Sequence, residues 1–185
     1  MSQPERSLVH NHLPEIPNAK GGRGSILALM GHTEVLAPVG GRALALADVP
    51  DPVFSQGIVG YGAAVDPPRE VVDAVAPVSG KILKLLPHAY VIVTSDNVGV
   101  LVHLGLDTVS LKGAGFTAHV AQGDTVTAGQ RMITYDVPSV IAAGLSPVIP
   151  VVVMDEREPG NISVADVVSA AAAIDSGATL FTAAK

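Results

Sequence analysis

The apolar residues of this chain come in short alternating runs that are separated by turn-forming residues. Two neighbouring runs read LLPHAYVIVT, over Leu85–Thr94, and GVLVHLG, over Gly99–Gly105. Alternation with a period of two is typical of a strand with one buried face, and the TSDNVG segment between the runs is typical of a turn. The pattern therefore predicts an antiparallel hairpin with one histidine in each strand.

The register of this hairpin decides where the two histidines point. A four-residue loop over Ser95–Val98 places Thr94 opposite Gly99. His88 and His103 then lie on one face as diagonal neighbours, because side chains alternate along each strand. The predicted core face carries Ala89, Val91, Val93, Val100, Val102 and Leu104, and the outward face carries His88, Tyr90, Ile92, Thr94, Gly99, Leu101, His103 and Gly105. A loop longer or shorter by one residue would separate the two rings.

A repeated motif predicts the fold class. APVGGRALAL, over Ala37–Leu46, recurs 39 positions later as APVSGKILKL, over Ala76–Leu85, with six of ten positions identical. Proline suits the start of a strand and glycine suits the turn, and further turn signals follow at Gly123, at Gly129 and in DSGATLF over Asp175–Phe181. The expected fold is all-β, an antiparallel β-sandwich or barrel-sandwich hybrid built from duplicated hairpin units with minor short helices.

Helix is expected in only two short segments. Asp136, followed by a proline two residues later, is typical of a helix start, and Gly144 is typical of its end. Ser163 and Asp166 resemble a capping box ahead of VVSAAAA, although a strand is also possible there.

Composition narrows the classes of function. Of 185 residues, 48% are hydrophobic and 15% are charged, and the net charge of −6 argues against binding to nucleic acid or an anionic membrane. The chain has no cysteine, which excludes disulfides, thiolate catalysis and cysteine-based zinc sites. Residues 1–25 are polar and lack the apolar core of a signal peptide. We expect a flexible leader over residues 1–25, one domain over residues 26–185 and a cytoplasmic location.

The paired histidines leave three kinds of chemistry open. Imidazole titrates in the range needed for general acid–base catalysis, and Asp107 is the nearest acid. Metal binding is a second possibility, although two histidines are fewer than the three protein ligands typical of catalytic zinc. The third is phosphoryl carriage on His103, with His88 as the donor to the phosphoryl oxygens. His32 and His119 have no partner in sequence and are expected to be satisfied or solvated.

Several motifs, taken in order, resemble the glucose-family IIA proteins of the bacterial sugar phosphotransferase system. They are DVPDPVFSQGIVGYG, APVSGK, GVLVHLGLDTVSLKGAGF, GDTVTAGQ and SPVIPVV, and the resemblance runs from about Val35 to the C-terminus. It implies a β-sandwich of duplicated hairpin units and a cytoplasmic phosphocarrier. Such a carrier takes a phosphoryl group from the histidine phosphocarrier protein and passes it to a IIB domain of a sugar permease during sugar uptake.

The resemblance also implies roles for individual residues. His103 matches the phosphorylated histidine, His88 its companion that stabilises the phosphoryl group, and Gly105 the glycine whose carbonyl fixes the ring tautomer. The implied partner-binding residues are the rim acids Asp51 and Asp107 and the apolar docking residues Val53, Phe54, Ile58, Val59 and Leu101. Core packing is an equal alternative for Phe54. Many members have a threonine where this chain has Leu86, whose side chain has no hydroxyl to hydrogen-bond an active-site ring.

Three other functions stand beside the carrier. A zinc-dependent, lysostaphin-like metallopeptidase uses a His-x-His pair, whereas this chain has His103 followed by Leu104 and Gly105. A lipoyl or biotinyl carrier, suggested by GDTVTAGQ, presents a lysine beside a methionine, and no lysine here has that neighbour. A regulatory module would bind transporters or enzymes through the same surface. The carrier requires no cofactor, and zinc at His88 and His103 would need a further ligand from a partner.

Overall fold

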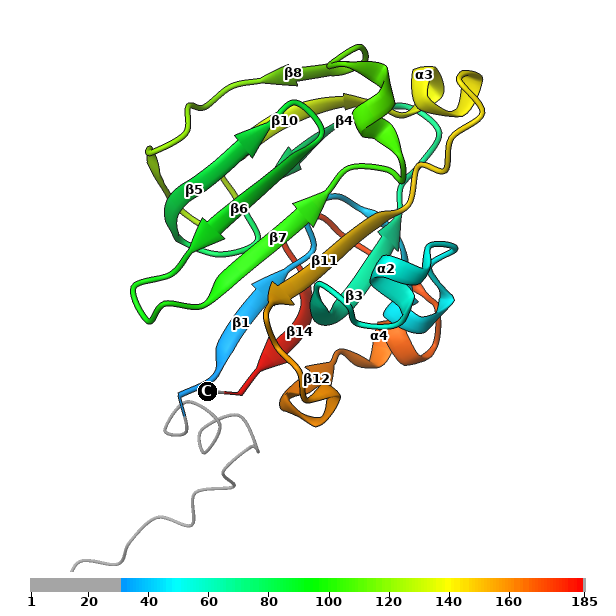
Figure 1. Ribbon diagram of the computed structural model, residues 1–185. Coiled ribbons are helices and arrows are strands. Elements are labelled where there is room, and N and C mark those ends of the chain that lie inside the picture. The colour runs from blue at the N-terminus through cyan, green and yellow to red at the C-terminus, as the bar shows by residue number, and fades with distance from the viewer. Residues whose placement is uncertain (1–30, 185) are drawn as a thin grey trace, which may run out of the picture.

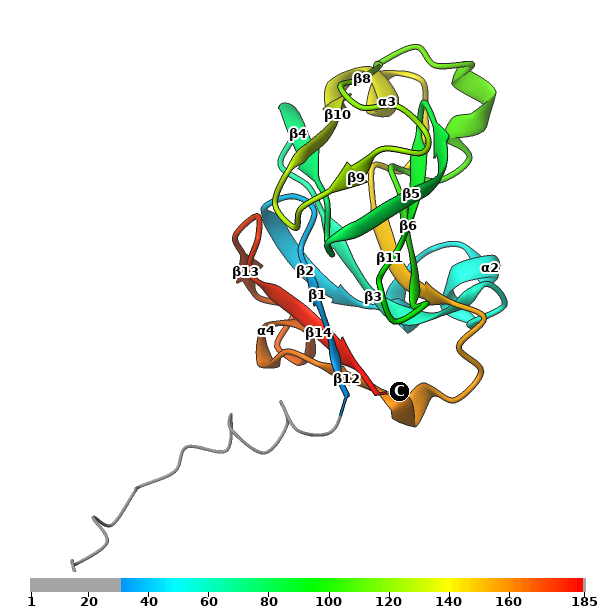
Figure 2. The ribbon, with the colours of Figure 1, turned by 90° about the vertical axis from the view of Figure 1, so that its left-hand side faces the viewer.

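The strands of the protein form one large sheet and two small ones, all with antiparallel pairing, in a computed structural model that describes residues 31–184. The eight-stranded sheet has the order β13 (Ala173–Ile174), β2 (Gly41–Ala45), β3 (Gly60–Asp66), β11 (Ile149–Met154), β7 (Gly99–His103), β6 (Ala89–Val93), β5 (Gly80–Leu86) and β9 (Thr125–Val126). The three-stranded sheets are β1 (Thr33–Leu36), β14 (Thr179–Ala183) and β12 (Ile162–Val164), and β4 (Val71–Val75), β10 (Arg131–Asp136) and β8 (Phe116–Ala118). In Figures 1 and 2 the large sheet is curled, and the two small sheets lie against it, which confirms the predicted all-β architecture.

The helical segments are short, as predicted. They are η1 (Leu46–Asp48), α2 (Pro52–Ser55), η2 (Thr108–Leu111), α3 (Val137–Ala142), η3 (Pro159–Asn161) and α4 (Asp166–Ser169). The predicted start of α3 is confirmed, because an oxygen of the Asp136 side chain accepts a hydrogen bond from the backbone N–H of Ser139 at 3.1 Å. The capping box is wrong: Ser163 lies within β12, and α4 begins at Asp166 without a side-chain cap. Among residues 31–184 no helix has the length and apolar character needed to cross a membrane.

The duplicated motif folds into two halves related by an approximate twofold axis. The backbone N–H of Leu36 donates to the carbonyl of Pro77 at 2.9 Å, and the N–H of Val75 donates to the carbonyl of Pro38 at 2.8 Å. Val75 and Pro77 follow Leu36 and Pro38 by the same interval that separates the two motifs. The two hydrogen bonds therefore exchange places under the axis, as expected for a duplicated unit.

Later turns hold each copy of the motif in the same way. The carbonyl of Ala37 accepts a hydrogen bond from the N–H of Gly177 at 2.9 Å, and the carbonyl of Ala76 accepts one from Gly129 at 2.8 Å. Both glycines have positive φ, of 81° and 87°, a backbone conformation that glycine adopts without strain. The two turn signals found in the sequence thus serve equivalent positions in the two halves.

The predicted register of the β6–β7 hairpin is wrong by one residue. Val93, rather than Thr94, lies opposite Gly99, and the loop takes five residues, 94–98. The N–H of Thr94 donates to the carbonyl of Val98 at 3.0 Å, and Asn97 closes the loop with a φ of 61°. Large apolar side chains determine this outcome, because the observed register places Tyr90 and Ile92 in the main core with Val100, Val102 and Leu104. The predicted register would have placed the smaller side chains of Ala89 and Val91 there instead.

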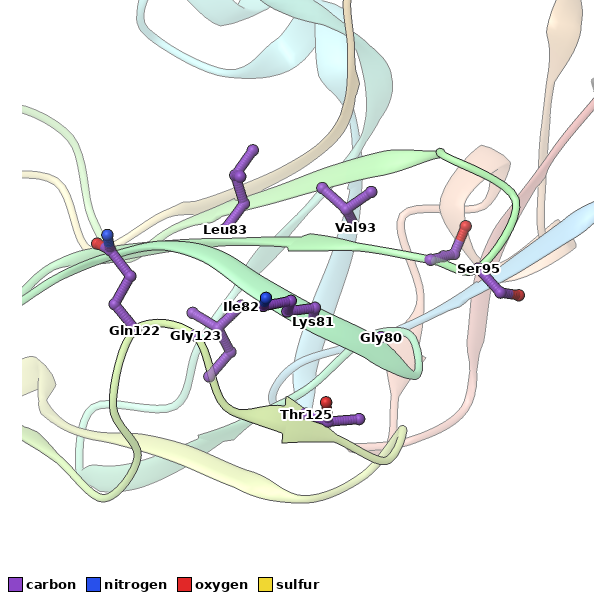
Figure 3. A pocket seen from close by; sticks show the side chains of 10 residues that line it. Gly80, Lys81, Ile82, Leu83, Val93, Ser95, Gln122, Gly123 and Thr125 are labelled. Carbon is purple, nitrogen blue, oxygen red and sulfur yellow. The ribbon is translucent and has the colours of Figure 1, made fainter.

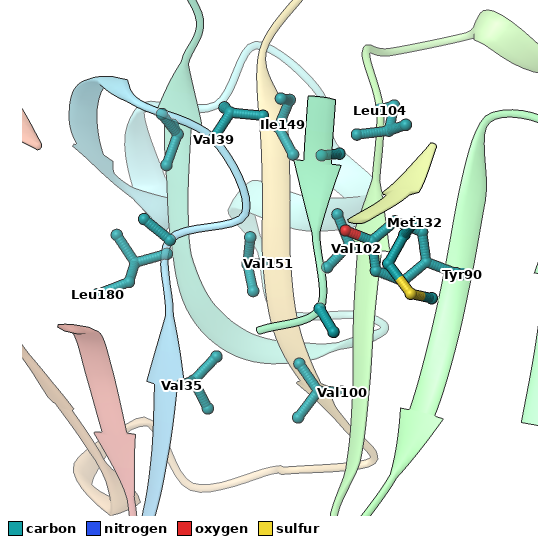
Figure 4. Close-up of a cluster of buried hydrophobic side chains, with 14 of the residues drawn as sticks. Val35, Val39, Tyr90, Val100, Val102, Leu104, Met132, Ile149, Val151 and Leu180 are labelled. Atoms are coloured by element: carbon teal, nitrogen blue, oxygen red, sulfur yellow. The ribbon is translucent and has the colours of Figure 1, made fainter. Parts of the chain in front are cut away.

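Two hydrophobic clusters lie on opposite faces of the large sheet. The main core fills the space between this sheet and the two small sheets, and it includes Tyr90 and Met132 (Figure 4). The hydroxyl of Tyr90 donates to the carbonyl of Val75 at 2.7 Å, so this buried polar atom is satisfied. The outer cluster consists of Leu44, Leu46, Val49, Phe54, Ala64, Leu106, Val148 and Val152. It anchors η1 and α2 against the outer face of the sheet.

Candidate active site

The rings of His88 and His103 meet on the outer face of the large sheet. Their centroids lie 5.0 Å apart, with the planes at 66° in an edge-to-face arrangement. His103 is the last residue of β7, whereas His88 lies in the two-residue turn between β5 and β6 rather than within a strand. Because a turn residue is free of strand alternation, the two rings come together even though the predicted hairpin register is wrong.

One nitrogen of the His103 ring is held by the backbone. Nδ1 lies 2.6 Å from the carbonyl oxygen of Gly105. A carbonyl only accepts hydrogen bonds, so Nδ1 carries the hydrogen, and Nε2 of the neutral ring keeps an unprotonated lone pair. Gly105 has a φ of 77°, and a Cβ at this position would lie 2.6 Å from the Cγ2 atom of Thr108. Only glycine fits the turn that aims this carbonyl at the ring.

The surroundings of His103 favour the neutral imidazole. Burial lowers its pKa, because removal from water disfavours the charged ring. The hydrogen bond to Gly105 and the negative charges of Asp51 and Asp107 act in the opposite direction and raise the pKa, but burial outweighs them. The ring is thus neutral near pH 7. The carboxylates of Asp51 and Asp107 favour any positive charge that develops on it.

The His88 ring is fixed differently. Its side chain is only 7% exposed, and burial followed by the charge of His103 lowers its pKa. Its backbone carbonyl accepts a hydrogen bond from the N–H of Leu104 at 2.7 Å, which extends the β6–β7 pairing past its last paired residues. Neither ring nitrogen of His88 has a hydrogen-bond partner within residues 31–184, and this ring is held by its neighbours alone.

Two phenylalanines flank the histidine pair. The Phe54 ring lies against His103 with centroids 5.4 Å apart, and the Phe116 ring lies against His88 at 6.4 Å. Phe116 stacks in turn on Tyr135, with centroids 5.3 Å apart and planes within 13°. The sequence analysis did not single out Phe116 or Tyr135, because neither carries a signal in a local motif.

The expected docking residues divide by exposure. Val53 and Ile58 are 42% and 55% exposed beside the site, and Val59 and Leu101 are half-buried against the outer cluster. Phe54 is only 6% exposed and belongs to that cluster, so it supports His103 from below and offers little surface of its own.

The two expected rim acids have different surroundings. The Asp51 carboxylate accepts a hydrogen bond from the N–H of Val53 at 2.8 Å and caps α2. Asp107 is exposed and makes no side-chain cap for η2. Two further apolar residues are exposed, Leu86 at 38% and Val109 at 66%, and the sequence analysis assigned neither to a surface.

Two other histidines and two of the cavities do not involve this pair. Nε2 of His119 lies 2.6 Å from the hydroxyl oxygen of Thr134, which donates to Asp73 at 2.6 Å, so His119 is satisfied as expected. His32 lies beside a separate shallow cavity of about 260 Å³. A cavity of about 680 Å³ opens over β5 and the end of β6, lined by residues such as Leu83 and Val93, and neither active-site histidine lines it (Figure 3).

The described residues offer no complete metal centre. Within residues 31–184 no three His, Asp or Glu side chains come together in a way that could hold a metal ion. The position that a His-x-His ligand pair would need is Gly105, so the site lacks the ligands of a zinc peptidase.

Comparisons with known proteins point to one family. A sequence profile for the phosphoenolpyruvate-dependent sugar phosphotransferase system, EIIA 1, matches residues 33–158. The chain is 38% identical over 138 residues to the PTS system glucose-specific EIIA component of Oceanobacillus iheyensis, covering 72% of this chain and 82% of that protein. It is 47% identical over 113 residues to the PTS system glucose-specific EIICBA component of Streptococcus pneumoniae serotype 4, covering 60% of this chain and 15% of that larger protein. The solved structure of glucose permease IIA from Mycoplasma capricolum aligns with a TM-score of 0.72 and 33% identity, covering 82% of this chain and 96% of that one.

Proposed function

Because this chain belongs to the EIIA 1 family of the phosphoenolpyruvate-dependent sugar phosphotransferase system, we propose that His103 is the residue that carries its phosphoryl group. The protein is a phosphocarrier: it accepts a phosphoryl group from the histidine phosphocarrier protein and passes it to a IIB domain of a sugar permease. The 2.6 Å contact between Nδ1 of His103 and the carbonyl of Gly105 carries the residue assignment, because it leaves Nε2 as the nucleophile.

The transfer step follows from this tautomer. The Nε2 lone pair of His103 attacks the phosphorus atom, the bond between phosphorus and the donor's nitrogen breaks, and its electron pair stays with the donor. The His103 ring becomes positively charged as the new bond forms. The Gly105 carbonyl and the charges of Asp51 and Asp107 stabilise that charge, since all three favour the cationic ring.

We propose that His88 stabilises the phosphoryl oxygens. Its ring lies edge-to-face with His103 at a centroid distance of 5.0 Å, which supports this role. An N–H of this ring would donate to a phosphoryl oxygen most strongly in the transition state, when charge on those oxygens is being redistributed. His88 therefore aids transfer without being the acceptor.

Four apolar residues, two exposed and two half-buried, form the proposed docking surface: Val53, Ile58, Val59 and Leu101. Phe54 lies beneath it and holds His103. Asp51 and Asp107 place negative charge at the rim, which suits a donor with basic residues around its own phosphorylated site.

Incubation with phosphoenolpyruvate and the upstream phosphotransferase proteins, followed by intact mass measurement, tests the assignment. Wild type and His88→Ala should each gain the mass of one phosphoryl group, but the His88 variant should pass it to a IIB domain about 100-fold more slowly. His103→Ala should gain nothing. His119→Ala, a variant of a histidine that is hydrogen-bonded to Thr134 and not to the site, is the matched control and should behave as wild type. Labelling of the His103 variant would overturn the assignment.

We propose that transfer needs no cofactor and takes place in the cytoplasm. The donor and acceptor supply every atom that the step requires. Zinc at His88 and His103 would take a further ligand from a partner protein, because the described residues provide only this pair. Tight zinc binding by the isolated chain, measured by titration calorimetry and abolished by His88→Ala, would contradict this proposal.

A further inference from the structure

The orientation of His88 presents a physical problem. A neutral imidazole that must donate to a phosphoryl oxygen needs a fixed ring plane, yet neither ring nitrogen of His88 is hydrogen-bonded within residues 31–184. The preceding side chains, Leu86 and Pro87, have no hydrogen-bonding groups. Packing against neighbouring rings is the remaining means of fixing this side chain.

A second ring, that of Phe116, also packs against His88. The Phe116 and His88 planes meet at 64° with centroids 6.4 Å apart, a geometry that aromatic quadrupoles favour. Together the contacts with His103 and Phe116 restrict the orientation of the His88 ring.

Phe116 is itself held in place by a rigid support. It stacks on Tyr135, which is fully buried and donates its hydroxyl to the carbonyl of Pro147 at 3.1 Å. Phe116 lies on β8 directly opposite Tyr135 on β10, so the backbone pairing also fixes the two rings relative to one another. This support is the only link from His88 through aromatic rings to the main core that the described residues provide.

The Phe116 ring separates a cavity from His88. A cavity of about 320 Å³ opens beside it, lined by Leu85, Leu86, Pro87, Gly113, Phe116 and Ala118. If the Phe116 ring were removed, this cavity would extend towards His88. The imidazole would then have room to turn away from His103.

We propose that Phe116, supported by Tyr135, is a positioning residue that holds the His88 ring in the plane needed for phosphoryl transfer. The proposal rests on the proposed function, because it requires His103 to carry the phosphoryl group and His88 to stabilise it. Phe116 does not touch the reacting atoms. Its effect is exerted through His88 alone.

Single-turnover transfer from the phosphorylated full-length chain to a IIB domain tests the proposal. Phe116→Leu should accept one phosphoryl group as wild type does but transfer it about 10-fold more slowly, because misplacement of a stabilising group costs rate. Phe116→Tyr, which keeps the ring, should restore the rate. Phe181→Leu removes a fully buried ring from β14 and is the control for a general loss of packing; it should lower stability without slowing transfer.

A double variant separates positioning from a merely structural role. In the His88→Ala background, Phe116→Leu should slow transfer no further. An equal 10-fold loss in both backgrounds, or an unchanged rate in the single variant, would overturn the proposal. If Phe116→Leu fails to fold, nuclear Overhauser contacts between the His88 and Phe116 rings of the wild-type protein decide the matter, and their absence overturns the proposal. Labelling of His103→Ala would instead overturn the proposed function and is read out separately.

Discussion

The two halves of the sheet share a backbone but differ in chemistry. Strands β2, β3 and β11 correspond under the approximate twofold axis to β5, β6 and β7, and the axis passes through the pair formed by Val102 and Val151. By the same correspondence, His103 has Val152 as its equivalent and His88 has Tyr61. One half therefore presents two imidazoles where the other presents apolar or aromatic side chains.

The connections between strands account for most of this difference. Residues 46–59 join β2 to β3 and fold into η1 and α2 over the outer face of the sheet, where they bury Val152. Only Pro87 and His88 join β5 to β6, which leaves that part of the outer face uncovered. The long connection of the first half reaches across to the second, where Phe54 contacts His103. The two halves thus share one backbone scaffold. The short connection in the second half leaves the histidine pair uncovered, and the long connection in the first half packs against it.

The largest effect should follow from altering Gly105, in the turn that fixes His103. The other half of the sheet has no such turn. Gly105→Ala would place a Cβ 2.6 Å from Thr108 at a φ of 77°, costing about 1–3 kcal/mol of stability and displacing the carbonyl that holds Nδ1. Phosphorylation should slow by about 100-fold, since the nucleophilic tautomer is no longer fixed. Denaturant unfolding and the initial rate of phosphorylation measure the two effects.

Gly123→Ala is the matched control for this change. Gly123 also has positive φ, at 93°, but no heavy atom lies within 4 Å of an added Cβ. Gly123→Ala should lower stability through the strain of a positive φ, but it should be phosphorylated as fast as wild type. A Gly105 variant that is phosphorylated as fast as the Gly123 variant would contradict the role given to the Gly105 carbonyl.

A smaller effect should follow from changing the surface that the first half contributes. Ile58→Lys puts a charge in the middle of the exposed docking surface, and we expect the apparent KM for the donor to rise about 10-fold with little change in kcat. Val164→Lys, at a 38% exposed apolar position on β12, is the control. Steady-state rates over a range of donor concentrations give KM and kcat for both variants. An equal rise in KM for Ile58→Lys and Val164→Lys would contradict a role for Ile58 in docking.

The smallest effect should come from the rim charge at Asp107. Burial lowers the pKa of His103 below its ordinary value of 6.5, so phosphorylation should fall only as the pH drops below that value and Nε2 becomes protonated. The Asp107 charge raises this pKa, and Asp107→Asn should therefore move the midpoint of the rate profile to still lower pH. The exposed Asp166→Asn variant should leave the profile in place. A shift towards higher pH would contradict the sign of this interaction.

The fold could be predicted from the sequence because its signals are local. The Ala-Pro-Val motif occurs twice in recognisable form, and glycines mark the turns that hold both copies. The hairpin register could not be predicted, because it depends on how Tyr90 and Ile92 fit a core built by distant strands. A five-residue loop closed by Asn97 resembles a four-residue one in the sequence.

The candidate site was predictable only in part, because some of its residues come together through strands that are distant in the sequence. The pairing of His88 with His103 was predicted from one short stretch of sequence. The role of the Gly105 carbonyl was predicted from the resemblance to a family. Phe116 and Tyr135 meet through pairing of β8 with β10, and no pattern along the chain brings them to His88. Burial of Phe54 likewise depends on how the connection between β2 and β3 folds back over the sheet.

Direct observation of the phosphorus–nitrogen bond tests the central claim most sharply. The chain labelled with ¹⁵N at histidine and phosphorylated by the upstream proteins should show coupling of ³¹P to a single ring nitrogen, Nε2 of His103, with Nδ1 still protonated and bonded to Gly105. Coupling to Nδ1 of His103, or to any nitrogen of His88, would contradict the account.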